Sequence, residues 1–151
     1  MKKVLLGMAV LLMGLLLYCP ETKAQNCILP TYYITDEDVD LLLRVAVLEG
    51  GGGDVDGMAH VMQVVLNRFE SERFPSTIPG VIFQENQFCT ADRLESAEIT
   101  PEAYVALDAV IFGEYRWNDS VFFESCDGLI WGDKYEHTFS YGGHDFYKLR
   151  R

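Results

Sequence analysis

The sequence has few basic residues for its length. Its 151 residues include 12 Lys and Arg against 23 Asp and Glu, which gives a formal net charge of −11 at pH 7. The phosphate backbone of a nucleic acid would be repelled by such a chain, and no basic cluster interrupts the acidic excess. We therefore expect no nucleic-acid partner.

Residues that commonly hold metals are also scarce and unsuitably spaced. The chain contains 4 Cys and 3 His; no two cysteines have the C-x-x-C spacing of a zinc or redox site, and the histidines match no metal signature. We expect neither a metal site nor a cofactor. Three cysteines, Cys27, Cys89 and Cys126, follow the N-terminal signal peptide that is predicted below. In an oxidising compartment two of these three would pair, and the sequence leaves the pairing open.

The sequence has no apolar run long enough to span a membrane, and its longest one, at the N-terminus, is short. Val4–Tyr18 is apolar over 15 residues, whereas a helix that spans a bilayer needs about 20. Two lysines precede this run, and Thr22–Ala24 offers the small residues that a signal peptidase reads. We predict a signal peptide over residues 1–24, a secreted or periplasmic mature protein, and no stable membrane insertion after cleavage. A lipid anchor at Cys19 is the alternative, disfavoured by the bulky residue before it.

No internal repeat and no low-complexity linker divides the rest of the chain. With 49% hydrophobic and 23% charged residues, the composition is typical of a packed globular domain. We expect an N-terminal extension over residues 25–34 and a single domain over residues 35–151, acting as a monomer.

The first strong pattern predicts a buried helix. Thr35 is a suitable N-cap, with three acidic residues in the positive first turn. Residues 39–48 are apolar at nearly every position, which is typical of a helix buried on all sides. The helix should end at Glu49, because the four glycines at 50–53 cannot sustain it.

Three more helices are predicted after the glycines. Asp54 or Asp56 would cap a second buried helix that ends near Arg68. Residues 77–83 favour a short helix with a proline in its first turn over an edge strand. A third clear helix would open at Thr100–Pro101 and stop at a glycine, Gly113.

The last third of the chain predicts a small sheet. Residues 121–123 and 138–147 are aromatic and β-branched, and turn-forming dipeptides separate them. Helices therefore come first and short strands last, which is the α+β pattern.

Glu49 lies in a setting that favours a protonated carboxyl group. Six of the seven residues before it are apolar, and its carboxylate would face the negative end of the helix dipole. An apolar setting also disfavours the charged form. A carboxyl group that keeps its proton near neutral pH is what a general acid requires. The alternative is a solvated glutamate at a fraying helix end, with no chemical role.

Several motifs occur in a recognisable order along the chain, namely Glu49–Gly53, Gly57, Asn67–Arg68, Phe74–Ile78, Gln84, Gln87–Phe88 and Tyr141–Tyr147. Together they resemble the cell wall hydrolase family typified by the spore cortex-lytic enzyme SleB. The resemblance spans roughly residues 40–148, and it depends on the order of the motifs and not on any single one.

The resemblance implies a peptidoglycan-cleaving domain with a small lysozyme-like α+β fold, related to goose-type lysozymes and lytic transglycosylases. Its substrate would be the glycan strands, cut between N-acetylmuramic acid and N-acetylglucosamine. The family's catalytic glutamate falls on Glu49. Family members often carry a second acidic residue four positions later, where this chain has Gly53.

A single catalytic carboxyl group is sufficient if the substrate supplies its own nucleophile. The resemblance implies this reaction, in which the muramyl C6 hydroxyl attacks C1 and forms a 1,6-anhydro ring. Two-carboxylate hydrolysis needs a second Asp or Glu. Asp54, Asp56 and Glu124 stay open as bases for water, so the hydrolytic outcome also remains open.

Further residues are expected to bind the sugars. Aromatic side chains pack against sugar rings, amides bond N-acetyl groups, and a histidine near the C-terminus adds a polar group. The predicted substrate-binding residues are Asn67, Gln84, Gln87, Trp131, Tyr141, His144 and Tyr147. For the Asn67–Arg68 pair, a role in holding the fold is the alternative to shaping a groove.

Two other functions compete with glycan cleavage. One is a non-catalytic peptidoglycan-binding module that keeps the groove. The other is a metal-dependent amidase that cuts the stem peptide.

Overall fold

The computed structural model describes residues 34–125 and 134–150. The predicted signal peptide, Cys27, Cys126 and Trp131 lie outside these residues. In the described part of the chain, no helix is long and apolar enough to cross a membrane.

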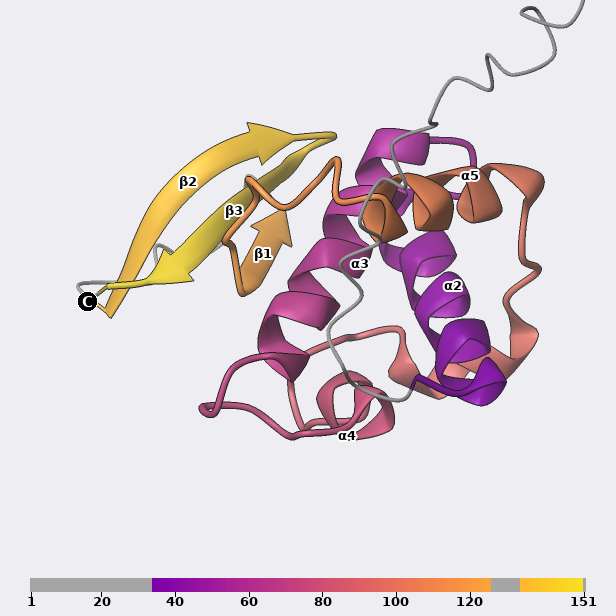
Figure 1. Ribbon diagram of the computed structural model, residues 1–151, viewed down its shortest axis with the longest axis horizontal. Helices are drawn as coiled ribbons and strands as arrows, with labels where there is room; N and C mark the ends of the chain where they lie inside the picture. Colours follow the sequence, from indigo (N-terminus) through magenta and orange to yellow (C-terminus); the bar gives the residue numbers. More distant parts are fainter. Residues whose placement is uncertain (1–33, 126–133, 151) are drawn as a thin grey trace, which may run out of the picture.

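Helices make up the first part of the described chain, and α3 (Val55–Phe69) lies at their centre (Figure 1). It packs against α2 (Asp36–Gly50), the short α4 (Ile78–Ile82) and α5 (Pro101–Ile111). The predicted caps are confirmed: Thr35 forms a capping box with Asp38, and the Asp54 side chain accepts from the N–H of Gly57. A 3-10 helix, η1 (Ala91–Ser96), was not predicted, because the sequence there has no apolar periodicity.

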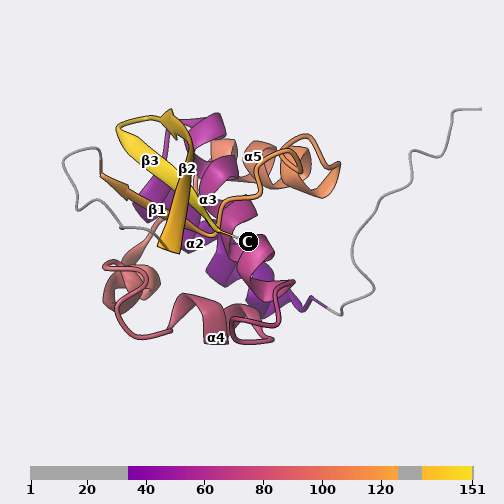
Figure 2. The same ribbon diagram turned by 90° about the vertical axis from the view of Figure 1, so that its left-hand side faces the viewer.

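A three-stranded antiparallel sheet ends the chain, in the order β1–β3–β2. Its strands are β1 (Phe122–Ser125), β2 (Tyr135–Tyr141) and β3 (His144–Leu149). Figure 2 shows the sheet in front of α3, which it covers. The prediction of an α+β fold, with helices first and a small sheet last, is confirmed. The turn predicted at Gly142 and Gly143 is confirmed: it joins β2 to β3, and the two glycines have φ of 57° and 81°.

The end of α2 and the start of α3 touch backbone to backbone. A β-carbon added to Gly50 would lie 2.7 Å from Met58 Cα, and one added to Gly57 would lie 2.6 Å from the carbonyl oxygen of Gly50. Only glycine allows this approach at both positions. The contact joins two helices that both pack apolar residues into the core, and it places Glu49, one residue before Gly50, at the edge of that core.

Asn67 joins α3 to the segment before β1. Its amide nitrogen donates to the carbonyl oxygens of Asn118 and Ser120, at 2.7 and 2.8 Å, and its Oδ1 accepts from Gln63 at 2.8 Å. Both amide hydrogens are therefore used within the fold. The predicted role of Asn67 in substrate binding is not supported by this position, since a sugar would have to displace these bonds.

Arg68 is buried beside Asn67 and holds the first strand. Its Nε donates to the carbonyl oxygen of Val121 at 2.5 Å, and its guanidinium lies 4.8 to 5.5 Å from three ring centroids, those of Phe74, Phe88 and Phe122. Burial lowers its pKa to about 10, against a smaller raising effect of Tyr135. The Asn67–Arg68 motif thus holds the fold, as the alternative reading of the sequence stated.

We expect Arg68→Ala to lower the free energy of unfolding by about 3 kcal/mol or more, because it empties a packed site between three rings and leaves the Val121 carbonyl unpaired. Urea unfolding checks this value. Arg93→Ala is the control, because Arg93 is exposed on η1, and it should change stability by less than about 0.5 kcal/mol. Equal effects of the two substitutions would contradict the assigned role of Arg68.

Candidate active site

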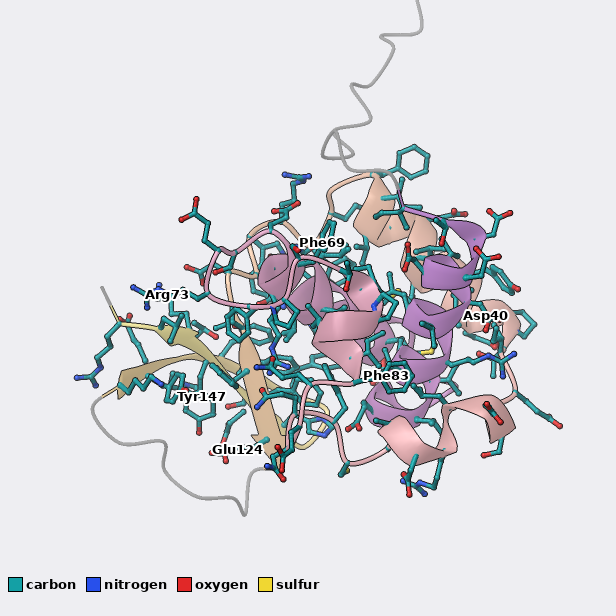
Figure 3. All side chains as sticks on the ribbon, turned by 90° about the horizontal axis from the view of Figure 1, so that it is seen from below. Asp40, Phe69, Arg73, Phe83, Glu124 and Tyr147 are labelled. Atoms are coloured by element: carbon teal, nitrogen blue, oxygen red, sulfur yellow. The ribbon has the colours of Figure 1, made fainter. Side chains whose placement is uncertain are left out.

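A cleft of about 610 Å³ opens between the end of α2, the segment before η1, and the sheet. The helical side contributes Glu49, and the sheet contributes Glu124 from β1 and His144 from β3. Figure 3 shows Glu124 on β1. The complete lining is Glu49, Asn86, Gln87, Phe88, Cys89, Phe123, Glu124 and His144.

Glu49 is half-buried and held at one oxygen. The hydroxyl of Thr90 donates to Glu49 Oε1 at 2.6 Å, and the Cys89 thiol lies 3.9 Å from the same oxygen. Thr90 is itself buried, with 4% of its surface exposed, so this donor is fixed by packing. Oε2 makes no hydrogen bond to any described residue. Glu49 therefore has one oriented oxygen and one that can give or take a proton.

Glu124 brings a second carboxylate to the cleft, from the sheet side. Within the described residues it has no hydrogen-bond or ion-pair partner. The other two carboxylates considered as bases are elsewhere: Asp54 caps α3 and bonds Tyr141, and Asp56 bonds Tyr115 and Tyr141. Of the three, Glu124 alone shares the cleft of Glu49.

The cleft has two phenylalanines among mostly polar lining residues, and none of the polar groups carries a permanent positive charge. Phe88 and Phe123 lie with ring centroids 6.0 Å apart, and the Phe123 ring is 5.4 Å from that of His144. No Lys or Arg is among the lining residues. Two carboxylates without a cation disfavour an anionic ligand. The arrangement suits an uncharged polar ligand with flat apolar surfaces.

Three of the predicted site residues come together here: Glu49, Gln87 and His144. Gln84 does not line this cleft, and its buried Oε1 has no hydrogen-bond partner among the residues that the structure describes. Tyr141 lies at the β2 edge of the sheet, bonded to Asp54 and Asp56. These positions do not support contact of Gln84 or Tyr141 with a ligand next to Glu49.

Tyr147, labelled in Figure 3, is also not among the residues that line the cleft. It is half-buried in β3, and its ring contacts His137 of β2 with centroids 5.5 Å apart. Its neighbour Phe146 is the residue that faces α3, where its ring lies 5.5 Å from that of His60. Because successive side chains of a strand point to opposite faces, Tyr147 is on the outer face of the sheet.

Sequence reasoning missed Asn86, Cys89 and Thr90. Asn86 has a φ of 60°, a conformation that asparagine tolerates better than most residues. All three lie within three positions of Gln87, so the predicted Gln87–Phe88 motif marked the correct loop. Nothing in the residue pattern indicated that a threonine hydroxyl would meet Glu49.

Comparison with known families gives one match that covers most of the domain. A sequence model of the family described as Cell Wall Hydrolase matches residues 52–147. Glu49 therefore lies three residues before the matched segment.

Similar proteins of known name and structure agree with this match. The spore cortex-lytic enzyme of Bacillus cereus is 35% identical over 69 residues, which are 46% of this chain and 26% of that enzyme. The crystal structure of the catalytic domain of Bacillus cereus SleB matches with a TM-score of 0.68 and 27% identity, over 79% of this chain and 94% of that one. The catalytic domain of the germination-specific lytic transglycosylase SleB from Bacillus anthracis matches with a TM-score of 0.66 and 26% identity, over 79% and 99%. The chain thus corresponds to about a quarter of the full-length relative and to nearly all of each catalytic domain.

We expect the Cys89 thiol to react with N-ethylmaleimide in the native protein, because it is free and exposed at the cleft. Peptide mapping by mass spectrometry should find the adduct on Cys89 without any denaturant. The Cys89→Ser variant is the control and should lack that adduct. Modification of Cys89 only after unfolding would contradict its position.

Proposed function

The chain belongs to the cell wall hydrolase family, as its motifs predicted, and we propose that it cleaves the glycan strands of peptidoglycan with Glu49 as the catalytic acid. The single observation that carries this proposal is the placement of Glu49 in a cleft of about 610 Å³: a buried threonine holds one carboxyl oxygen, and the other accepts no hydrogen bond from any described residue. The family membership supplies the substrate class, and the chemistry of the cleft supports it.

The cleft suits a neutral polysaccharide. Phe123 is only half-buried and offers apolar surface to sugar rings, with the buried Phe88 packed behind it. Gln87 and Asn86 carry amide groups that can donate to and accept from N-acetyl substituents. The excess of carboxylates explains why recognition would depend on these neutral contacts and not on attraction of a charged ligand.

The proposed reaction is of the lytic transglycosylase type, between N-acetylmuramic acid and N-acetylglucosamine. Protonated Glu49 donates its proton to the glycosidic oxygen, and the bond from that oxygen to the muramyl C1 breaks. The C6 hydroxyl of the same muramyl residue then forms a bond to C1, and the Glu49 carboxylate takes the proton that this hydroxyl loses. The enzyme returns to its starting state, and no water or cofactor is consumed.

Hydrolysis is the second candidate outcome, and the position of Glu124 favours it. Glu124 lines the same cleft and has no partner among the described residues. In an inverting glycosidase a second carboxylate activates a water on the far side of the sugar. Glu124 is the residue of this chain that would do so, and the product would then be a reducing sugar.

The site of action would be outside the cytoplasm. The predicted signal peptide over residues 1–24 would export the domain to the cell envelope, where peptidoglycan lies. The domain would act as a monomer, since a single chain supplies every group of the proposed mechanism.

We expect Glu49→Gln to abolish release of glycan fragments from purified peptidoglycan, with a loss of at least about 100-fold, because glutamine cannot donate the required proton. Mass spectrometry of the muropeptides measures the products. The control is Glu102→Gln, an exposed glutamate in the first turn of α5, which should keep wild-type activity.

The same digest separates the competing functions. Binding of peptidoglycan without any product from the wild-type protein would show a binding module. Free amino groups without new sugar ends, lost on addition of EDTA, would show an amidase. Glycan products from Glu49→Gln at the wild-type rate would remove Glu49 from the mechanism.

We expect Glu124→Gln to keep forming the 1,6-anhydro product, within about 3-fold of the wild-type rate, because intramolecular attack by the C6 hydroxyl needs no second carboxylate. The masses of the anhydro and reducing products differ by one water, so the muropeptide spectrum reports both. A wild type that releases reducing ends, together with a Glu124→Gln variant that releases none, would establish hydrolysis instead.

A further inference from the structure

A second pocket, which the proposed mechanism does not use, lies at the β2 edge of the sheet. Its volume is about 350 Å³, and we call it the aromatic pocket. Three elements form it: the first turns of α3, the segment after α5, and the end of β2. Its lining residues are Asp56, His60, Glu114, Tyr115, Trp117 and Tyr141.

Aromatic rings form the walls of this pocket. The His60 ring lies 5.1, 5.5 and 5.0 Å from the ring centroids of Tyr115, Trp117 and Tyr141. Trp117 nevertheless exposes 61% of its surface. A tryptophan that is packed on one side and open on the other presents a π-face to a ligand.

The charge of the aromatic pocket is negative. Asp56 and Glu114 line it, and no Lys or Arg does. The Tyr115 hydroxyl donates to Asp56, and the Tyr141 hydroxyl donates to Asp54 at 3.1 Å, with a longer contact of 3.4 Å to Asp56. Burial, together with the hydrogen bonds to these carboxylates, raises the pKa of both tyrosines, so their hydroxyls stay protonated as donors.

His60 adds a buried polar group to the aromatic pocket. It is 4% exposed, and burial lowers its pKa against smaller raising effects of Asp56 and Asp54, so the ring is neutral at neutral pH. The amide nitrogen of Asn118 lies 3.5 Å from its Nδ1 and can only donate, which leaves the ring proton on Nε2. Nε2 makes no hydrogen bond within residues 34–125 and 134–150. Nε2 is not one of the buried side-chain atoms that lack a partner, so its N–H is open to the aromatic pocket and can donate to an acceptor on a ligand.

We propose that the aromatic pocket binds a primary ammonium group on a peptide, with a neighbouring peptide carbonyl that accepts from His60. Aromatic faces and fixed carboxylates without a competing cation are the combination that selects an organic cation over a neutral or anionic group. The source of the amine would be the peptide portion of peptidoglycan, and this assignment of the source rests on the proposed function.

The pocket and the cleft are positioned so that two parts of one polymer could bind to both. Tyr141 of the aromatic pocket and His144 of the cleft are register partners across the β2–β3 hairpin. Partners in an antiparallel ladder have Cα atoms about 5 Å apart. A glycan strand in the cleft and a peptide branch in the aromatic pocket would therefore contact the same hairpin.

Binding of soluble muropeptides to the Glu49→Gln protein tests the proposal without any cleavage. The probe is a disaccharide-peptide with a free amino group, and the matched probe is the same molecule after N-acetylation. We expect Trp117→Ala to weaken binding of the free-amine probe about 10-fold and to leave binding of the acetylated probe unchanged. Glu114→Gln should have the same selectivity with a smaller effect. Titration calorimetry gives the Kd values.

Phe112→Ala is the matched control, because Phe112 is also 61% exposed and is absent from the pocket lining. It should bind both probes as the parent does. Equal affinity for the two probes, or no loss with Trp117→Ala, would overturn the proposal. Cadaverine alone is the third ligand. If it binds as tightly as the muropeptide, the assignment of the amine to the wall peptide would be overturned. These outcomes do not depend on whether the wild type cleaves glycan.

Discussion

The backbone contact between Gly50 and Gly57 determines where the catalytic candidate lies. It lets the end of α2 meet the start of α3 at a distance that no other residue permits. Both helices contribute buried apolar residues to the core, so their meeting point is held by core packing. Glu49 is the residue next to that point. Its polar group therefore stands at the boundary between the packed interior and the cleft, with a glycine turn beside it that contributes no bulky side chain.

A second constraint controls the opposite wall of the cleft. The Asn67–Arg68 pair attaches the chain before β1, and the first residue pairs of the sheet, to the end of α3. β1 begins at Phe122, directly after this attachment, and Glu124 lies two residues further along the strand. The separation of Glu49 and Glu124 thus depends on contacts at both ends of α3. At its start the glycine contact positions α2, and at its end Asn67 and Arg68 position the chain before β1. Motif residues that touch no ligand can in this way decide which groups face it.

Local patterns in the sequence were sufficient for the four α-helices of the described residues, though not for the 3-10 helix η1. Thr35 and Asp54 are caps whose partners lie three residues away, and apolar runs between caps and glycines bound the two central helices. The partners of Glu49 could not be found in the same way. Thr90 is 41 residues from Glu49 and meets it only because η1 packs against α2. For Tyr141 and Tyr147 the obstacle was strand direction, since the hairpin turn decides which edge and which face each aromatic ring occupies. Residue type alone indicated sugar contact for both tyrosines, but neither lines the cleft that contains Glu49.

The hydrogen bond from Thr90 has a consequence for the order of events at Glu49. With Oε1 occupied, a proton leaves and returns through the same atom, Oε2. In the proposed reaction the departing saccharide must vacate this atom before the attacking hydroxyl can approach it. The carboxyl group would then exchange protons with one substrate oxygen at a time. Slow release of the first fragment would delay the attack of the C6 hydroxyl and limit the overall rate.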